Sequence, residues 1–468
     1  MSTMSQSVLA LGPNALLSAL GLWRGPQQVE PTPAEDWRQA RVDVVIHVDR
    51  HQPDITFCLA SLLAQTHPLG RVLLIDDGGA DRDHSVQIAR EFARANGLSL
   101  VAIERMWTIG KGATLKRQAR ELDGDVMFVL DGNVVLESPD YIARCVEKLY
   151  EGAGTASVRG LHRPSRMADR ARWSASPQFR AWLDGDEHVD PRRPRDRWSG
   201  VWGWFNDTCR ECIGIFQQRF LDRGQMALFG SVGAPAFTAT AYRRRYLKDV
   251  FDRYEPMYGD GLTRRPELFV ALALCNEGYH NSQLPDVVAH APGAGLHALA
   301  REHHHISSAF MQSCHAFDAL LRTPLKWPRR WWRQRSRAAR LREDDMRNAR
   351  RVVEAYRQPF GERLTHQQGR PVGWALFFGA LEKVLVPLLV LALACMAAWS
   401  WLAALLLVDA LLWLAALALV SRPGERLRML GKGVVALPMR HGLLWTELFT
   451  VLASLRRWPG RALRRAAA

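Results

Sequence analysis

The chain has 468 residues, a formal net charge of +15 and 48% hydrophobic residues. A single hydrophobic core rarely extends over such a length, so two or three structural units are expected. The hydrophobic content excludes an intrinsically disordered chain. The positive charge indicates an anionic partner, and much of it lies between Arg322 and Arg351, just before an apolar run. This placement favours membrane lipids as partners and argues against nucleic acid.

Residues 1–41 contain apolar pieces that are too short to span a bilayer, followed by the proline-rich stretch "PQQVEPTPAED". They are expected to form a leader and a linker. From residue 42 to 160, short apolar runs alternate with helical patterns. The expected strands are 43–49, 71–77, 98–104 and 126–131, and the expected helices are 55–66, 84–97 and 113–124.

This alternation predicts an α/β fold with a mainly parallel sheet that is covered by helices on both faces. Ligands bind beyond the carboxyl ends of the strands in such sheets. Asp76, Asp77 and Asp131 all lie at such ends. Their coincidence is the first indication of a functional site.

The second half of the folded region is interrupted. Residues 161–200 are polar and rich in arginine and are expected to be an irregular insertion, whereas 201–310 again show a globular pattern. Within the latter, helices are expected at 205–222 and 265–277.

The C-terminal third is expected to meet a membrane. Residues 311–371 are basic and predict interface helices, and 372–421 are apolar enough for two spans, near 374–397 and 401–420. Glu382, Lys383 and Asp409 should each face a helix interface, a polar path or the lipid headgroups, since charges are costly in hydrocarbon.

Both flanks of the apolar region are basic, which predicts a multi-pass protein of the cytoplasmic membrane with its folded domain in the cytoplasm. Residues 422–468 are more amphipathic and are expected to lie in the membrane interface, with a third span as the alternative.

The stretch "VLDGNVVL" raises the question of a metal site. Asp131 ends a strand, and Asn133 stands where a second carboxylate would complete an Asp-x-Asp pair. A divalent cation on a diphosphate needs oxygen ligands, which a carboxylate and an amide carbonyl both supply. Three interpretations stay open: a cation site that depends on the nucleotide's own phosphates, metal-free phosphate binding, and lost catalysis.

Four motifs follow one another in the order "CLASLLAQTHP", "LLIDDGGADR", "IGKGATLKRQA" and "VLDGNVVL". They resemble those of the membrane-integrated family 2 glycosyltransferases with a GT-A fold, which include cellulose, chitin and hyaluronan synthases and the alginate polymerase. The resemblance implies a UDP- or GDP-linked sugar as donor. It assigns the nucleoside to Asp76 or Asp77, the diphosphate to Lys111, and Mg²⁺ or Mn²⁺, bound weakly without nucleotide, to Asp131 and Asn133.

The resemblance extends to the acceptor side of the site. "RGQMALFGSVGAPAFTATAYRRRYL" is similar to the family's acceptor-binding segment, where Phe237 or Tyr242 would stack on a sugar ring. "MYGDGLTRRPELF" is similar to the segment that carries the general base, which is Asp260 here. A carboxylate suits this role once burial or a nearby phosphate raises its pKa.

The family's Q-x-x-R-W motif, which contacts acceptor and diphosphate, has no clear counterpart. By distance the match is "REHHHISSAF", which implies Glu302 and His305 as the contacting residues. By identity the match is Arg330-Trp331, nearly thirty residues later. The departure puts processive synthesis in doubt.

The leading hypothesis is an inverting hexosyltransferase of family 2 that acts on a polysaccharide or lipid-linked acceptor, as in bacterial exopolysaccharide synthesis. Two spans are few for secretion alone, so partner subunits of a synthase or export complex are expected. The alternatives are a non-catalytic scaffold subunit and a single-sugar transferase to polyprenyl phosphate.

Overall fold

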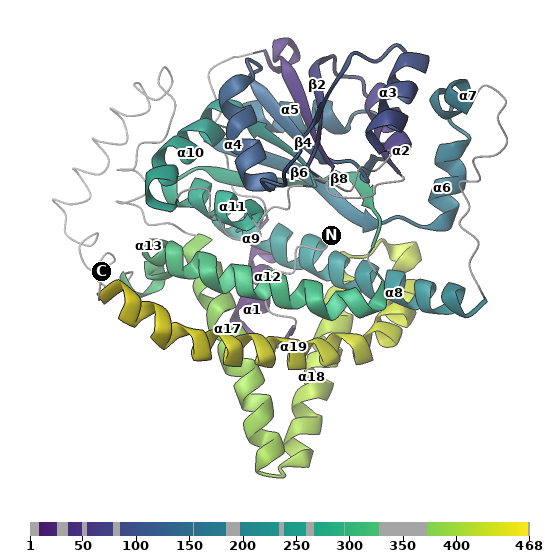
Figure 1. Ribbon diagram of the computed structural model, residues 1–468. Helices are drawn as coiled ribbons and strands as arrows, with labels where there is room; N and C mark the ends of the chain where they lie inside the picture. The colour runs from purple at the N-terminus through teal and green to yellow at the C-terminus, as the bar shows by residue number, and fades with distance from the viewer. Residues whose placement is uncertain are drawn as a thin grey trace.

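The computed structural model describes residues 9–25, 36–48, 54–77, 85–152, 154–183, 197–233, 238–258, 266–293, 295–326 and 372–466. An α/β domain forms the upper part of the molecule, and a layer of helices lies beneath it (Figure 1). A hairpin of two long helices projects from this layer, away from the sheet.

The α/β domain is built on one eight-stranded sheet with the order β3-β2-β1-β4-β7-β6-β8-β5. The strands are β1 Val42–Val48, β2 Leu69–Asp76, β3 Leu100–Glu104, β4 Val126–Asp131, β5 Val135–Leu136, β6 Thr155–Pro164, β7 Ala239–Arg243 and β8 His280–Ala291. The first four strands in the order are parallel, as predicted. The remaining half is mixed, because β7 runs antiparallel to both β4 and β6.

Helices cover both faces of the sheet. Val44 and Ile46 of β1 belong to one hydrophobic core, and the intervening Val45 belongs to the other. Successive strand side chains point to opposite faces, which explains why the strand sequences are apolar without interruption. The first core is covered by α2 Ile55–Leu63, α3 Ser85–Ala95 and α5 Tyr141–Glu151, and the second by α4 Lys111–Glu121, α10 Arg244–Tyr258 and α11 Pro266–Glu277.

The segment expected to be an irregular insertion is partly regular. β6 continues to Pro164, and two short helices follow, α6 Met167–Ser174 and α7 Pro177–Leu183. Phe179 of α7 is buried and stacks on Phe57, with ring centroids 5.0 Å apart. Aromatic packing therefore holds this segment against the domain.

The helical layer beneath the sheet combines segments from both ends of the chain. It contains α1 Pro13–Arg24, α8 Arg197–Ile215, the π-helix η2 Phe216–Asp222, α9 Arg223–Phe229, α12 Leu296–Ala316, α13 Asp318–Leu321 and α19 Arg426–Ala466. Helix α19 crosses the base of the projecting hairpin, which consists of α17 Val372–Cys395 and α18 Trp399–Val420 (Figure 1). Two short 3-10 helices complete the described elements, η1 Trp37–Gln39 and η3 Pro423–Glu425.

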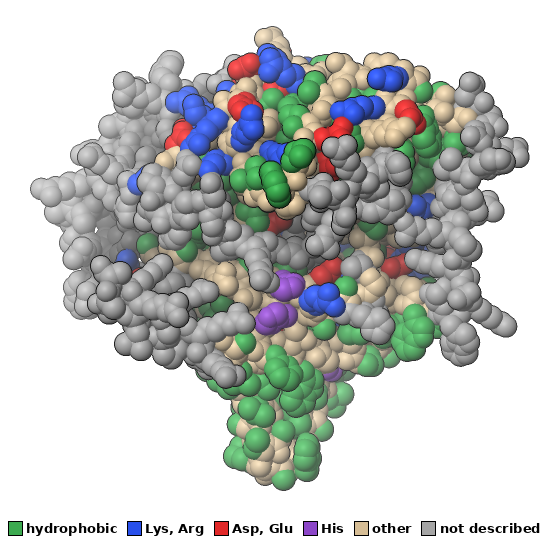
Figure 2. Space-filling model, in the orientation of Figure 1, with side chains coloured by type: hydrophobic (Ala, Val, Ile, Leu, Met, Phe, Trp, Pro, Cys, Tyr) green, Lys and Arg blue, Asp and Glu red, His purple; other side chains and the backbone are tan. Residues whose placement is uncertain are grey.

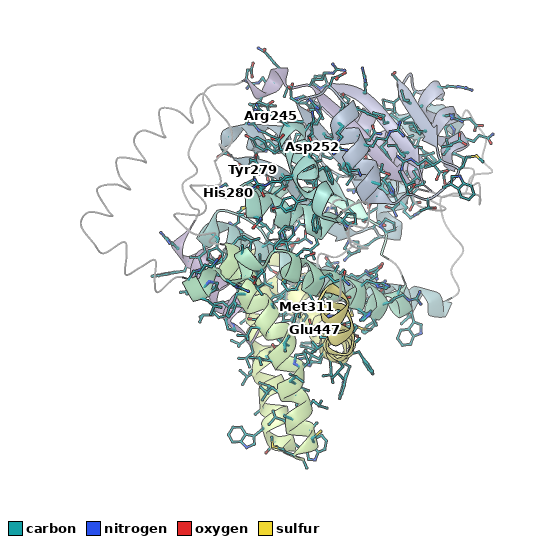
Figure 3. The ribbon with its side chains drawn as sticks, turned by 60° about the vertical axis from the view of Figure 1, so that its left-hand side comes forward. Arg245, Asp252, Tyr279, His280, Met311 and Glu447 are labelled. Atoms are coloured by element: carbon teal, nitrogen blue, oxygen red, sulfur yellow. The ribbon has the colours of Figure 1, made fainter. Side chains whose placement is uncertain are left out.

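Helices α17 and α18 are both long and apolar enough to cross a membrane. Hydrophobic side chains cover much of the hairpin where it projects (Figure 2). The charges that the sequence places in these helices are buried against protein, as predicted. Lys383 Nζ lies 3.0 Å from Glu447 Oε1 of α19. Figure 3 shows Glu447 next to Met311 of α12, a helix that packs against α19.

The two acidic residues of the hairpin bind the N-terminal segment. Asp409 accepts hydrogen bonds from the backbone N–H groups of Ala10 and Leu11, at 2.7 and 3.0 Å. Glu382 accepts one from the N–H of Asn14, at 2.7 Å. Free N–H groups at a helix start need such acceptors. Part of the expected leader is therefore a packed helix, α1, whose start the hairpin caps.

Candidate active site

The carboxyl ends of β2, β1 and β4 lie side by side and gather the acidic residues that the sequence singled out. Val48 of β1 pairs with Asp76, and the neighbouring His47 pairs with Asp131. Adjacent strands lie about 4.8 Å apart, so Asp76 and Asp131 are separated by one intervening strand. Both side chains are half-buried at this edge.

Asp77, one residue beyond β2, has a supporting role that sequence reasoning missed. Its side chain is buried and accepts hydrogen bonds from the backbone N–H groups of Ile109 and Gly110, at 3.0 and 2.6 Å. Arg105 contacts the same carboxylate at 3.3 Å. Asp77 thus fixes the loop that leads into α4, which leaves the half-buried Asp76 as the better candidate for a nucleoside ligand.

The electrostatics of Asp77 follow from these contacts. Burial alone would raise its pKa, but His47 and the two backbone N–H groups favour the charged carboxylate and lower its pKa to about 2. Gly110, one of the two donors, has a φ of 88°. Glycine adopts this left-handed conformation without strain, which explains its position just before α4.

Lys111 and Asp131 form the centre of the candidate site. Lys111 is the first residue of α4, and its Nζ lies 2.5 Å from Oδ1 of Asp131 at the end of β4. Their side chains are only 12% and 15% exposed. The helix start, the ammonium group and the carboxylate together offer positive charge for phosphate and an oxygen for a cation.

Asn133 lies on the tight turn after β4. The N–H of Gly132 donates to the carbonyl of His47, and the N–H of Val134 donates to that of Asp131, both at 3.0 Å. Asn133 is half-buried. Within the described ranges, no group of three or more His, Cys, Asp or Glu side chains could hold a metal ion.

The acceptor-side prediction for Tyr242 is wrong. Tyr242 belongs to β7, lies opposite Met127 and is fully buried in the second core. A side chain packed between a sheet and its covering helices cannot stack on a sugar. Phe237 and Asp260 lie outside the described residues, as does the alternative pair Arg330-Trp331.

Glu302 and His305 both lie on α12, in the helical layer. Glu302 forms an ion pair with Arg210 of α8, at 2.9 Å. Its carboxylate is thus used to hold two helices together. His305 is half-buried. Of its neighbours, His303 lies 3.3 Å from Glu447, and His304 contacts Thr450 at 2.7 Å.

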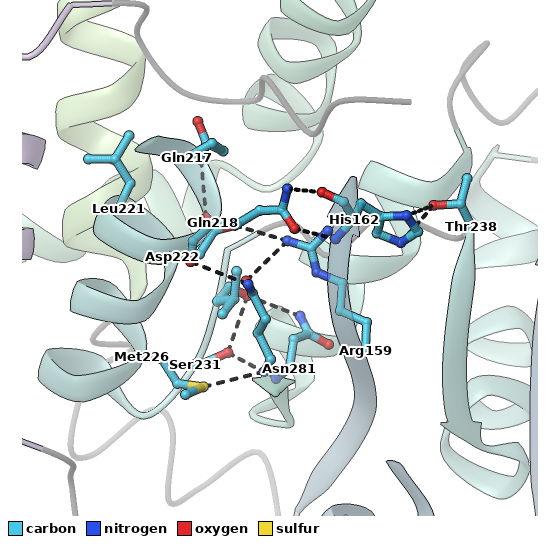
Figure 4. A network of polar contacts seen from close by, with 12 residues as sticks. Arg159, His162, Gln217, Gln218, Leu221, Asp222, Met226, Ser231, Thr238 and Asn281 are labelled. Carbon is cyan, nitrogen blue, oxygen red and sulfur yellow. Dashed lines mark hydrogen bonds and ion pairs between the residues drawn. The ribbon is translucent and has the colours of Figure 1, made fainter. Parts of the chain in front are cut away.

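A polar network beneath the sheet was also missed by sequence reasoning (Figure 4). Arg159 of β6 is fully buried and pairs with Asp222 at the end of η2, at 2.9 Å. Burial raises the pKa of Asp222 to about 6, although Arg159 and Gln217 favour its charged form. At the end of β6, His162 contacts Thr238, with 3.0 Å between Nε2 and Oγ1.

With this geometry in view, the comparisons with known proteins identify the domain. Residues 43–251 match the family described as glycosyl transferase family 2. They form a family 2 glycosyltransferase domain. The match begins at β1 and ends in α10, so it contains Asp76, Lys111 and Asp131. The predicted α/β domain with helices on both faces of its sheet, followed by apolar helices, is confirmed.

The glycosyltransferase domain has relatives of known name. An N-acetylglucosaminyltransferase of Mesorhizobium japonicum is 25% identical over 272 residues, which are 56% of this chain and 54% of that protein. An undecaprenyl-phosphate 4-deoxy-4-formamido-L-arabinose transferase of Klebsiella pneumoniae is 32% identical over 139 residues, 29% of this chain and 41% of that protein. The chain thus spans about half, or less, of the length of these relatives.

Among solved structures, a similar chain is the mannosyltransferase PcManGT from Pyrobaculum calidifontis in complex with GDP-Man and Mn²⁺. It is 16% identical, the comparison covers 95% of both chains, and the TM-score is 0.49.

Proposed function

We propose that the chain is an inverting glycosyltransferase held at the cytoplasmic membrane. It moves a sugar from a UDP- or GDP-linked donor to a hydroxyl group of a polysaccharide or lipid-linked acceptor, as in exopolysaccharide synthesis. The observation that carries the proposal is the pair of Lys111 and Asp131, 2.5 Å apart at the carboxyl edge of the sheet. A phosphate-binding cation beside a metal-binding carboxylate suits a nucleoside diphosphate.

The donor-binding roles follow the order of the strands. Asp76 accepts hydrogen bonds from the nucleoside, since a carboxylate can accept from base N–H and ribose hydroxyl groups. Lys111 contacts the diphosphate. Asp131 and Asn133 hold Mg²⁺ or Mn²⁺, with the remaining ligands supplied by phosphate oxygens and water, as is usual for sites with few carboxylates.

The residues fit such a cation because one carboxylate and one amide oxygen stand on the same turn, after β4. When bound, the cation stabilises negative charge on the leaving diphosphate. Asp260 takes the proton of the acceptor hydroxyl as general base. Phe237 and His305 complete the acceptor side in this proposal, while Glu302 contributes by holding α8 and α12 together.

The apolar hairpin and α19 keep the domain at the bilayer. Helices α17 and α18 cross the membrane, and α19 lies in its interface. This placement is supported by exposed apolar side chains along α19, namely Leu427, Val434, Trp445, Phe449 and Leu452. In this proposal, partner subunits complete the path by which a long polysaccharide product crosses the membrane.

A second candidate acceptor is polyprenyl phosphate. Two relatives that match the chain over 114 and 139 residues are undecaprenyl-phosphate transferases by name. In that case each reaction transfers one sugar to a lipid phosphate, and no polymer forms. Product length separates the two acceptors.

The test uses the full chain purified in detergent with UDP-glucose, UDP-N-acetylglucosamine and GDP-mannose, each with Mn²⁺. Release of nucleoside diphosphate that is lost in Asp260→Asn, with donor binding retained, supports the proposal. Donor binding without turnover by the wild type in native membranes would instead support the scaffold alternative.

A further inference from the structure

The register of the sheet brings His162 to the edge that carries Asp131. Strand β7 lies between β4 and β6. Leu130 of β4 pairs with Ala239 of β7, so the next residue of β4, Asp131, lies beside the residue before β7, Thr238. The hydroxyl of Thr238 in turn contacts the ring of His162, near the end of β6. His162 therefore follows Asp131 along the same edge, two strands or about 10 Å further.

The side chain of Gln218 holds the backbone of His162 in place through two hydrogen bonds. Its N–H donates to Oε1 of Gln218 at 2.6 Å, and its carbonyl accepts from Nε2 of the same side chain at 3.0 Å. Gln218 belongs to the π-helix η2 and is buried. The end of β6 is thereby tied to the helical layer, as Figure 4 shows. A ring held on such a backbone is suited to contact a ligand in one orientation.

The ring of His162 is half-buried and has capacity for a second partner. Thr238 Oγ1 lies 3.0 Å from Nε2 and 3.4 Å from Nδ1, and one hydroxyl cannot serve both nitrogens. Burial lowers the pKa of His162 well below its ordinary value, and the positive charges of Arg159 and Lys111 act in the same direction. A neutral imidazole carries one donor and one acceptor nitrogen.

These properties fit a hydroxyl group better than a phosphate. Near the same edge, Lys111 already supplies the positive charge that a diphosphate needs. A neutral ring that both donates and accepts matches the hydroxyl groups of a sugar. We propose that His162 contacts the sugar of the nucleotide-sugar donor, with Thr238 as the positioning residue for its ring.

This inference rests on the proposed function and deepens it. Along the sheet edge, the half-buried Asp76 of β2 comes first, Asp131 of β4 lies two strands further, and His162 of β6 two strands beyond that. The same order describes a nucleotide sugar: nucleoside, diphosphate, sugar. The order of the strands thus matches the order of the chemical groups.

The test compares ligands that differ only by the sugar. Affinities of UDP and UDP-glucose, and of GDP and GDP-mannose, are measured with Mn²⁺ by calorimetry on the purified full chain. In His162→Ala the nucleotide sugar binds about fivefold to tenfold more weakly, the effect of losing one hydrogen bond. The nucleoside diphosphate binds as in the wild type. His162→Gln, which keeps a donor and an acceptor, recovers part of the loss, and Thr238→Val shows a smaller loss.

His280→Ala is the matched control. His280 of β8, the strand that pairs with β6, is also half-buried, and burial likewise lowers its pKa. It pairs with Thr155, at the opposite end of β6 from His162. Its replacement should leave both affinities unchanged. An equal loss for UDP and UDP-glucose in His162→Ala, or no loss for either, overturns the role of His162. If the wild type binds none of the four ligands, the proposed function itself is overturned.

Discussion

Nζ of Lys111 lies 2.5 Å from Oδ1 of Asp131, so the two groups assigned to diphosphate and cation contact each other. Both are mostly buried, which strengthens their attraction relative to an exposed pair. A divalent cation that binds Asp131 competes with the ammonium group for the carboxylate. Cation and nucleotide should therefore bind together, because Lys111 could contact the phosphates once Asp131 no longer holds its ammonium group.

The first prediction concerns this cooperation. Asp131→Asn removes the only carboxylate proposed for the cation, so Mn²⁺ should no longer tighten nucleoside diphosphate binding. Sugar transfer should fall roughly 100-fold, because the leaving diphosphate loses its electrostatic stabilisation. Titration calorimetry with and without EDTA measures the first effect. The control is Asp252→Asn, which removes an exposed carboxylate paired with Arg120, 2.6 Å away.

The second prediction concerns a variant with a carboxylate in place of the amide of Asn133. Asn133→Asp places another carboxylate on the turn after β4, which should tighten Mn²⁺ binding in the absence of nucleotide by roughly tenfold, since affinity rises with ligand charge. The free Mn²⁺ concentration, followed by electron paramagnetic resonance, measures this directly. Unchanged Mn²⁺ affinity in this variant would count against a cation site at Asn133.

The third prediction concerns the buried Asp77. Its pKa falls from 3.8 to about 2 in the folded chain. Each pKa unit corresponds to about 1.4 kcal/mol, so its ionised form stabilises the fold by roughly 2 kcal/mol. Because the folded-state pKa is the lower one, this stability is present above pH 4 and is lost as the pH falls toward 2.

Asp77→Asn should therefore lower the melting temperature at pH 7, and the difference from the wild type should shrink as the pH falls below 4. Diphosphate affinity should fall as well, since the loop before Lys111 loses its anchor. A melting difference that stays constant between pH 7 and pH 3 would contradict the assigned contacts.

The fourth prediction tests the packing of α1 against α9. A Cβ atom on Gly21 would lie 2.0 Å from the carbonyl oxygen of Gly224, a backbone atom that cannot move freely. Gly21→Ala should destabilise the protein by about 1–3 kcal/mol through overpacking. The control is Gly442→Ala in α19, where a Cβ meets nothing within 4 Å. There, alanine should stabilise by about 0.5–1 kcal/mol through its helix propensity. Thermal unfolding in detergent distinguishes the two.

Local patterns predicted the positions of Asp76 and Asp131 in the fold well. Asp76 and Asp131 end strands whose apolar sequences are buried on both faces, so their place at one edge followed from strand direction alone. The role of Asp77 did not follow, because its partners, Ile109 and Gly110, are more than thirty residues away and offer only backbone groups.

Two other residues, Tyr242 and His162, were not predicted correctly, each for a physical reason. Tyr242 lies in a short antiparallel strand. We predicted from its aromatic ring that it contacts a sugar, but the ring is buried in the hydrophobic core. His162 was hidden in an arginine-rich stretch that looked irregular, yet "TASVRGLHRP" is the continuous strand β6. The apolar residues at the start of β6 were the feature of the sequence that could have predicted this strand.

Contacts between residues far apart in the chain could not be predicted from the sequence. The start of α1 is capped by Glu382, 368 residues away, and the residues just before α1 are bound by Asp409, 398 or more residues away. No local pattern can reveal such partners. The sequence did predict that these acids must avoid hydrocarbon, and the chain meets that requirement with its packed N-terminal segment and with Arg440 of α19, which forms a buried ion pair with Asp409.

The most direct test is an experimental structure of the full chain with Mn²⁺ and the nucleotide sugar that binds most tightly, with the metal located by anomalous scattering. We predict Mn²⁺ between Asp131, Asn133 and the diphosphate, with Nζ of Lys111 moved from Asp131 onto a phosphate oxygen. A nucleotide bound elsewhere, with the contact between Lys111 and Asp131 intact, would contradict this prediction.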